Sequence, residues 1–302
     1  KVNYGFICMM RKDLINSEKA FKEALELTKE CFARGDVGDD PYLLATIYDS
    51  LRLIVSKNNR MQEAEEYMSS ALEERRRLLK TAPITSARLI ELADSMGFVA
   101  ESEERKNHPE EASALMDEAV NIIKGYEGHK DAYAYALLNR AKYRQTKSPE
   151  IPEGFLEEMN VIIPALDAVA IKDKRTCENL AQAYMFRSMT RDPNDYDDLL
   201  DDLKGAYDNL YTVAQMGDVN EMFLMSVAHS YLVLLNMKDH DRAKEVREEL
   251  MELGISQSDL DRASRGTIGN VNSKKTKIDM LSSQAAKPIP GRRLRRQIKH
   301  KE

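Results

Sequence analysis

A pattern that recurs about every 44 residues constrains this 302-residue chain more than any other feature of its sequence. In each copy, a small or apolar residue is followed by a second one four positions later and a third one three positions after that. Successive copies are separated by 44, 48, 44, 43 and 44 residues and begin at Ala20, Ala64, Ala112, Leu156, Leu199 and Ala243. Such a constant spacing predicts a repeat architecture in which each unit packs mainly on its neighbours.

The offsets of four and three place the members of each copy on one face of an α-helix, where small side chains let two helices approach closely. We therefore expect helix packing at Ala20, Ala64, Met68, Ala71, Ala112, Met116 and Ala119, with Ala24 and Leu27 completing the first copy. The later copies are looser and read Leu156/Asn160/Ile163, Leu199/Leu203/Ala206 and Ala243/Arg247/Leu250.

Short polar turns rich in Asn, Asp, Ser and Pro separate the apolar stripes, and no alternating β-branched run is present. The sequence thus predicts an all-α fold of six antiparallel helix pairs, near residues 2–35, 40–80, 85–125, 130–170, 173–215 and 219–253. We expect a capping helix at 254–266 and a basic, extended tail at 267–302. Pro164 should kink or interrupt the second helix of the fourth pair.

Two segments resemble a known family. The run from Met61 to Glu74 and the run from Pro109 to Ala119 are similar to the second helix of a tetratricopeptide repeat, in the long-period variety of kinesin light chains and bacterial sensor proteins. The resemblance implies a right-handed superhelix whose concave groove receives an extended peptide or a helix. The family's frequent Trp is missing. No Lys/Asn clamp for a partner's C-terminal carboxylate stands at the expected inner positions, which argues against a chaperone-tail adaptor.

Signatures of catalysis are missing from the sequence. There is no Gly-rich phosphate loop, no His-Glu-x-x-His and no Gly-x-Ser-x-Gly, so we expect no catalytic, cofactor or metal residue. His229 should be a core or groove residue. The carboxylates of Asp197, Asp198, Asp201 and Asp202 should form a solvated helix start. We expect Cys8, Cys31 and Cys177 to be small buried side chains in a reducing cytosol.

One polar and aromatic set is a candidate partner-binding surface, because Tyr and Arg are favoured at interfaces. The set lies on the predicted first helices of pairs four and five and consists of Asn139, Arg140, Tyr143, Arg144, Tyr184 and Arg187. The alternative is an ordinary exposed helix face with the tyrosines packed in the core.

Charge is divided unevenly along the chain. Residues 272–302 contain ten Lys or Arg against Asp279 and Glu302, a net of +8, whereas the whole chain is −6, which leaves −14 on residues 1–271. The basic residues include Lys274, Lys275, Lys277, Arg292, Arg293, Arg295 and Arg296. Three interpretations stay open: a solvated linker to a further domain, a segment that binds acidic protein (this chain's own body or a partner), or a contact with nucleic acid phosphates.

The function that we expect is a non-enzymatic scaffold or adaptor that binds a protein or peptide, alone or as the sensing part of a larger protein or complex. The alternative is a nucleic-acid-associated adaptor that uses the tail. No apolar stretch is long enough to span a membrane. The first ten residues have neither a starting Met nor the layout of a secretory leader, so we expect sequence upstream and a cytoplasmic or nuclear location.

Overall fold

The computed structural model describes residues 1–35, 40–148, 150–192, 194–217 and 219–260, and these segments form helices and turns without any strand. The first residues of the expected capping helix are helical, at 257–260, and Leu260 is buried. The remainder of that helix and the basic tail lie outside the described residues.

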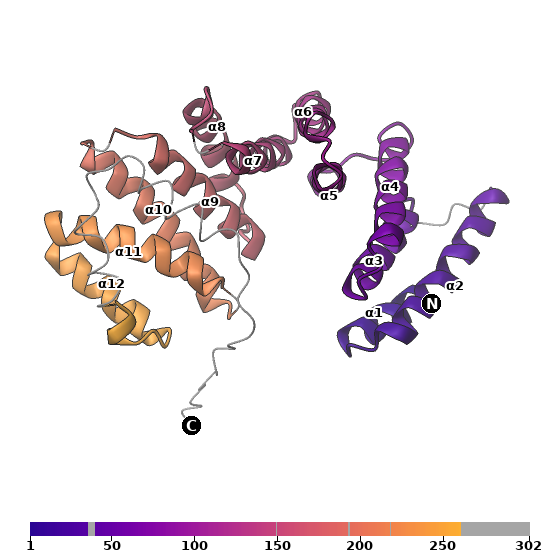
Figure 1. Cartoon of the computed structure of the whole chain (residues 1–302), viewed down its shortest axis with the longest axis horizontal. Coiled ribbons are helices and arrows are strands. Elements are labelled where there is room, and N and C mark those ends of the chain that lie inside the picture. Colours follow the sequence, from indigo (N-terminus) through magenta and orange to yellow (C-terminus); the bar gives the residue numbers. More distant parts are fainter. Residues whose placement is uncertain (36–39, 149, 193, 218, 261–302) are drawn as a thin grey trace. The chain divides into compact units, whose positions relative to one another are not determined.

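Helices follow one another along the chain with short connections (Figure 1). They are α1 (Val2–Met10), α2 (Leu14–Ala33), α3 (Leu43–Lys57), α4 (Met61–Leu78), α5 (Ser86–Arg105), α6 (Pro109–Lys124), α7 (Lys130–Lys147), α8 (Phe155–Asp167), α9 (Lys174–Thr190), α10 (Tyr196–Gln215), α11 (Glu221–Lys238) and α12 (His240–Glu252). Each residue range that was expected to hold a helix pair contains two of these helices.

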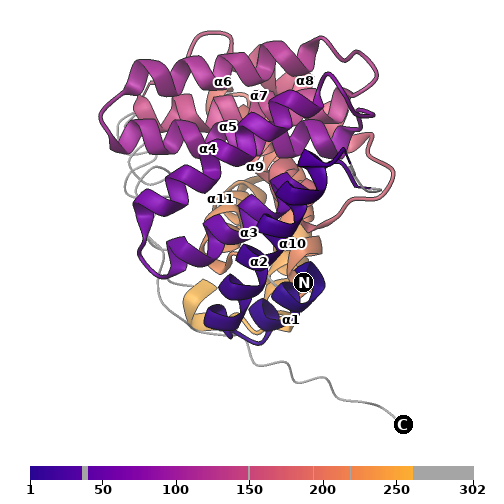
Figure 2. The same cartoon turned by 90° about the vertical axis from the view of Figure 1, so that its right-hand side faces the viewer.

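The chain divides into two compact units, unit 1 at Lys1–Tyr143 and unit 2 from Arg144 onward. In unit 1 each helix from α1 to α6 packs on the next one, and Figure 2 shows α5 and α6 side by side. In unit 2 the same holds from α8 to α12. Consecutive packing of this kind is consistent with a helical solenoid.

Unit 1 repeats one turn geometry three times, after α1, α3 and α5. Lys12, Asn59 and Asn107 each adopt a left-handed conformation, with φ of 62°, 59° and 65°. In each turn the following residue donates its backbone N–H to the carbonyl five residues earlier, as in Arg60 N–H to Val55 O at 3.0 Å. This hydrogen bond closes the helix end and reverses the chain, so the second helix of each pair runs back along the first.

Side-chain bonds also follow the repeat length. Arg60 donates to Glu18, 42 residues earlier, at 2.8 Å. Arg76 donates to Glu118, 42 residues later, at 2.7 Å. In unit 2 the Tyr207 hydroxyl donates to Glu249, again 42 residues away, at 2.8 Å. Neighbouring helix pairs are therefore in direct contact over sequence separations close to one repeat length.

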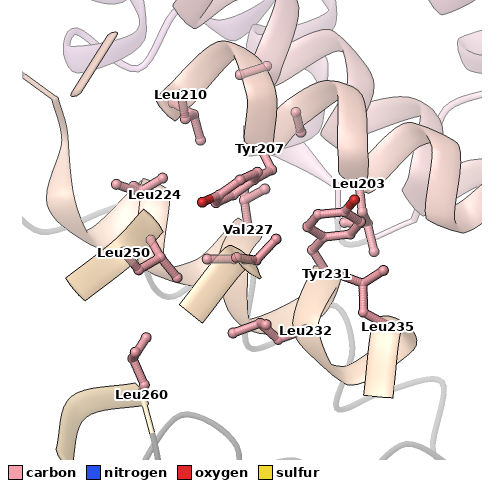
Figure 3. Close-up of a cluster of buried hydrophobic side chains, with 14 of the residues drawn as sticks. Leu203, Tyr207, Leu210, Leu224, Val227, Tyr231, Leu232, Leu235, Leu250 and Leu260 are labelled. Atoms are coloured by element: carbon pink, nitrogen blue, oxygen red, sulfur yellow. The ribbon is translucent and has the colours of Figure 1, made fainter. Parts of the chain in front are cut away.

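A large core cluster lies in unit 2, where α9, α10, α11 and α12 meet (Figure 3). The rings of Tyr207 and Tyr231 are fully buried and their centroids are 5.5 Å apart. Burial, together with the bond to Glu249, raises the pKa of Tyr207 far above its usual value. Leu260 packs into the same cluster, so the segment after α12 covers part of this core.

The small residues that were expected at helix contacts are buried in repeats two and three, where Ala64, Met68, Ala71, Ala112, Met116 and Ala119 are all at most 6% exposed. In the first repeat, Ala20 and Ala24 are buried but Leu27 is 51% exposed. The inference for Leu27 was wrong because Thr28, one position later, faces the core together with Leu25.

Two later repeats agree with the expected positions only in part. In α8 Ile163 is buried as expected, but Phe155 and Met159 are buried in place of their neighbours Leu156 and Asn160. In α12 Ala243 and Leu250 are buried as expected, and Val246 is buried in place of Arg247. Helix α8 also continues through Pro164 to Asp167, so the expected interruption is wrong. The proline stands within the last turn, where its missing N–H removes one hydrogen bond and the buried Leu166 still packs.

Candidate functional site

Unit 1 contains a cavity of about 380 Å³ that is lined by α1, α3 and α5 and has one residue of α4 in its floor. The second helices α2 and α6 contribute none of its lining. The cavity thus lies along one side of the unit, on the first helices of three successive pairs. We call it the first-helix groove. A volume of this size is in the range of sites that hold a small molecule or a few side chains.

The floor of the groove is Arg75, which is only 5% exposed. Its guanidinium donates to Ser95 Oγ at 2.8 Å and to the carboxylate of Asp49, and it lies 3.7 Å from Glu91. Its Nε has no hydrogen-bond partner although the atom is buried. Arg75 therefore joins α3 to α5 through its terminal guanidinium nitrogens.

Arg52 contributes a second guanidinium to the lining of the groove. Its plane lies over the Phe98 ring, 4.1 Å from the ring centroid, where the ring's negative face attracts the cation. Its Nε is 4.0 Å from Asp49 and, like that of Arg75, is buried without a hydrogen-bond partner. The groove thus contains two arginine N–H groups that no side chain satisfies.

Carboxylates from α3 and α5 share the groove with these arginines. The Asp49 and Glu91 side chains are 32% and 35% exposed. Glu91 also accepts from Arg88, which stands outside the lining, at 3.0 Å. Asp94 accepts from the buried Tyr135 hydroxyl of α7 at 2.6 Å. The lining therefore holds three carboxylates and two guanidiniums.

An apolar surface completes the groove. Phe6 and Met9 come from α1, and Leu53 and Phe98 from α3 and α5. Leu53 is 37% exposed and the other three are partly buried. Phe6 meets the buried Phe21 ring edge to face, 5.1 Å between centroids, which fixes its orientation.

The partner-binding set predicted from the sequence is divided between the two units. Asn139, Arg140 and Tyr143 belong to unit 1, whereas Arg144, Tyr184 and Arg187 belong to unit 2. Asn139 is half-buried on α7. Arg140 pairs with Asp117 at 2.9 Å, and Arg144 pairs with Glu158 at 3.0 Å.

The aromatic and basic members of the set are also engaged within the chain. Tyr143 donates to Glu104 at 2.8 Å, and burial together with this bond raises the pKa of Tyr143 to about 12. Arg187 lies over the Tyr184 ring, 5.4 Å from its centroid, and pairs with Asp202 at 2.6 Å. These contacts join the side chains to neighbouring helices of the same chain.

One carboxylate of the acidic N-terminal turns of α10 is buried in the core. Asp202 is fully buried and receives Arg187 and Arg191. The interpretation of this carboxylate as a solvated one was wrong because two arginines from the end of α9 reach it. Asp197, in contrast, is 86% exposed and pairs with Lys238.

Ser86 of α5 lies beside a carboxylate and a histidine. Ser86 donates to Asp131 at 2.7 Å and lies 2.9 Å from His129 Nδ1. The serine hydroxyl is thus bound to the carboxylate, whereas a nucleophilic serine needs a base that takes its proton. Within the described segments no group of three His, Cys, Asp or Glu could hold a metal ion.

The cysteines and His229 differ in their burial. Cys8 and Cys177 are buried, but Cys31 is exposed near the end of α2, so the expectation of burial was wrong there. His229 is half-buried, and burial lowers its pKa. In the part of the chain that the structure describes, every helix is too short or too polar to cross a bilayer.

The sequence analysis predicted none of the groove residues as binding residues, and Arg75 was the one with the clearest signal. It stands four positions after Ala71, so it continues the stripe of Ala64, Met68 and Ala71 on the packing face of α4. A cation on an apolar helix face was a signal for a buried charge. The neighbours Arg76 and Arg77 concealed it, since the run of three arginines resembles a solvated helix end.

Comparisons with known proteins show similarity to solved structures but not to known sequences. No protein family matches the chain, and no curated protein matches its sequence. The crystal structure of BtubC (BKLC) from P. vanneervenii is 15% identical and covers 96% of this chain and 98% of that chain, with a TM-score of 0.47.

Proposed function

We propose that this chain is a non-enzymatic scaffold that binds a segment of another protein in the first-helix groove. The main observation in favour is the cavity itself, which lies on the first helices of three successive pairs and has partly exposed apolar and charged side chains in its lining.

The apolar part of the groove supports the same proposal. Leu53 and its neighbours offer a surface on which a partner's side chain becomes buried, and full burial of one large apolar side chain is worth about 1.5–3 kcal/mol. Arg52 and Phe98 are held against each other before any ligand arrives. A preorganised wall reduces the entropy that binding must overcome.

The finer assignment of the fold belongs to this proposal. Repeated turns in unit 1 and bonds between positions 42 residues apart favour stacked helix pairs of the tetratricopeptide type. Six pairs stacked in a right-handed superhelix would place first helices on the inner, ligand-binding side. The groove on α1, α3 and α5 agrees with that placement.

A matched pair of variants tests the proposed function. Leu53→Glu places a charge on the groove wall, and Met61→Glu places the same charge on α4, outside the groove; the two native side chains are 37% and 45% exposed. The chain and both variants are immobilised, and the proteins that they capture are quantified by mass spectrometry. Partners should be lost with Leu53→Glu and kept with Met61→Glu. Equal capture by both variants contradicts the proposal.

The basic tail supports a second candidate, an adaptor that contacts nucleic acid through the segment from Lys274 to Arg296. The observation in its favour is the net charge of +8 on residues 272–302. Phosphate contacts make binding fall steeply with salt. Binding of a fluorescent oligonucleotide that disappears on deletion of 272–302 and weakens by orders of magnitude between 50 and 200 mM salt would favour this function; no binding at low salt would exclude it.

A further inference from the structure

A second surface of unit 1, on one side of α1, is apolar and exposed. Tyr4, Ile7 and Met10 are 55%, 42% and 76% exposed. Their spacing of three residues places them on the same side of the helix, and we call this set the α1 stripe. Gly5 is buried on the opposite side, against the Phe21 ring of α2. The lining of the first-helix groove does not include the stripe, so the stripe is a separate surface.

The equivalent stripe of α3 is buried. It lies 44 residues later, which is the distance between the first two copies of the repeat, and consists of Tyr48, Leu51 and Ile54. Leu51 and Ile54 are fully buried, and Tyr48 is half-buried. These side chains pack in one cluster with Phe21, Ala24 and Leu25 of α2. The stripe of α3 is therefore covered by the second helix of the preceding pair.

The same positions are covered in α5. They lie a further 48 residues along the chain, at Met96, Val99 and Ser102. Met96 and Val99 pack in a cluster with Leu72 of α4. Ser102 Oγ donates to Glu65 of α4 at 2.5 Å. Both equivalents of the α1 stripe thus receive the second helix of the preceding pair, whereas the α1 stripe itself has side chains like those of α3 and is exposed.

From this equivalence we infer that the α1 stripe is a docking surface for an amphipathic helix of another protein. The helix takes the position that α2 has on α3 and α4 has on α5, so the contact continues an interface that unit 1 already forms twice. Its apolar face resembles that of Phe21, Ala24 and Leu25, with large, small and large side chains at positions i, i+3 and i+4. The surface is independent of the first-helix groove, and the inference goes beyond the proposed function.

A second copy of this chain does not offer such a face within the residues that the structure describes. The apolar faces of the second helices from α2 to α10 are already buried in the chain. In α12, counted from Ala243 as from Ala20 in α2, the positions of the three apolar residues hold Lys244, Arg247 and Glu248. Charged side chains that replace apolar ones on the stripe would have to be buried at a cost, so the occupant is a different protein.

A helix copied from this chain is a direct probe of the stripe. A fluorescent peptide with the sequence of residues 13–34 presents the apolar face that covers α3, and a chemical staple between Glu26 and Glu30, which are exposed in the chain, keeps it helical. The peptide is titrated with the full chain and followed by anisotropy. Ile7→Lys should weaken binding at least about tenfold, because burial of one large apolar side chain contributes a factor of this size.

Two controls separate the stripe from the rest of unit 1. Met61→Lys makes the same change on α4, at a side chain that is 45% exposed, and should change the affinity less than about twofold. Leu53→Glu, in the first-helix groove, should also leave the affinity unchanged. On the peptide side, Leu25→Asp should abolish binding to the unaltered chain, which tests the contact without any change in the folded protein.

Three results would overturn the inference. They are no binding of the peptide at about 1 mM, equal weakening by Ile7→Lys and Met61→Lys, and binding that is lost with Leu53→Glu but kept with Ile7→Lys. None of these results depends on partners captured by the groove, so the inference and the proposed function can fail separately.

Discussion

Two helical glycines give opposite predictions for the same substitution. Gly97 lies in α5, and a β-carbon added there would meet only the Met116 methyl group, at 3.5 Å. Gly205 lies in α10, and a β-carbon there would stand 2.7–2.8 Å from three atoms of the Tyr184 ring. Alanine is preferred over glycine in a helix interior by about 1 kcal/mol, so the local contribution has the same sign at both sites and the contacts decide the outcome.

The magnitudes follow from these distances. Gly97→Ala should stabilise the chain by about 0.5–1 kcal/mol, since the new methyl group makes an ordinary contact. At Gly205 the ring cannot easily move, because Arg187 lies over Tyr184 and is held by the buried Asp202. Overpacking costs about 1–3 kcal/mol, so Gly205→Ala should destabilise the chain by about 1–2 kcal/mol after the gain in helix propensity.

Urea denaturation followed by circular dichroism at 222 nm measures both effects, since the chain has no Trp for fluorescence. A third variant isolates the cause: in a Tyr184→Ala background, Gly205→Ala should no longer destabilise. If Gly205→Ala is as stabilising as Gly97→Ala, or if its cost persists without the ring, the contact between α9 and α10 is not as described.

Four further predictions concern other contacts. Asp202→Ala should reduce the free energy of unfolding by about 2–3 kcal/mol, which is less than the loss of a fully buried ion pair because both arginines keep some exposure. Asp197→Ala should leave urea unfolding unchanged. Ala112→Phe should overpack α6 and cost roughly 1–3 kcal/mol; an unchanged thermal midpoint would contradict its buried position. The pKa of Tyr143 is raised to about 12 in the folded chain, so its contribution to stability is complete below pH 10 and is lost from pH 10 to 12. Tyr143→Phe should therefore reduce the loss of stability that is measured over this pH range. Deletion of residues 272–302 should leave the helical array folded, and a loss of circular dichroism beyond the deleted length would contradict that.

The helices could be predicted from the sequence because their signals are local. The stripe at Ala64, Met68 and Ala71 and the polar turn at Asn59 lie within a few residues of the helix ends that they determine. Where a stripe has two neighbouring apolar candidates, as at Phe155 and Leu156 in α8, the local pattern cannot choose between them. Packing against the adjacent helix decides which one is buried.

The candidate site was harder to predict because ion pairs between helices depend on contacts distant in sequence. Arg187 and Arg144 are the residue types that interfaces favour, yet Asp202 and Glu158 bind them within the chain. The groove depends on Arg75 passing from α4 to Ser95 of α5, 20 residues later. The sequence spacing indicates that Arg75 is on the packing face of α4. The position of its guanidinium beside Ser95 becomes known only from the fold.

Binding of a protein segment to the first helices of unit 1 is tested most directly by a crystal structure of the full chain with a peptide from a captured partner. The peptide should lie along α1, α3 and α5, with one of its side chains on Leu53 and Phe98. A peptide bound elsewhere on the chain, with this groove empty, would contradict it.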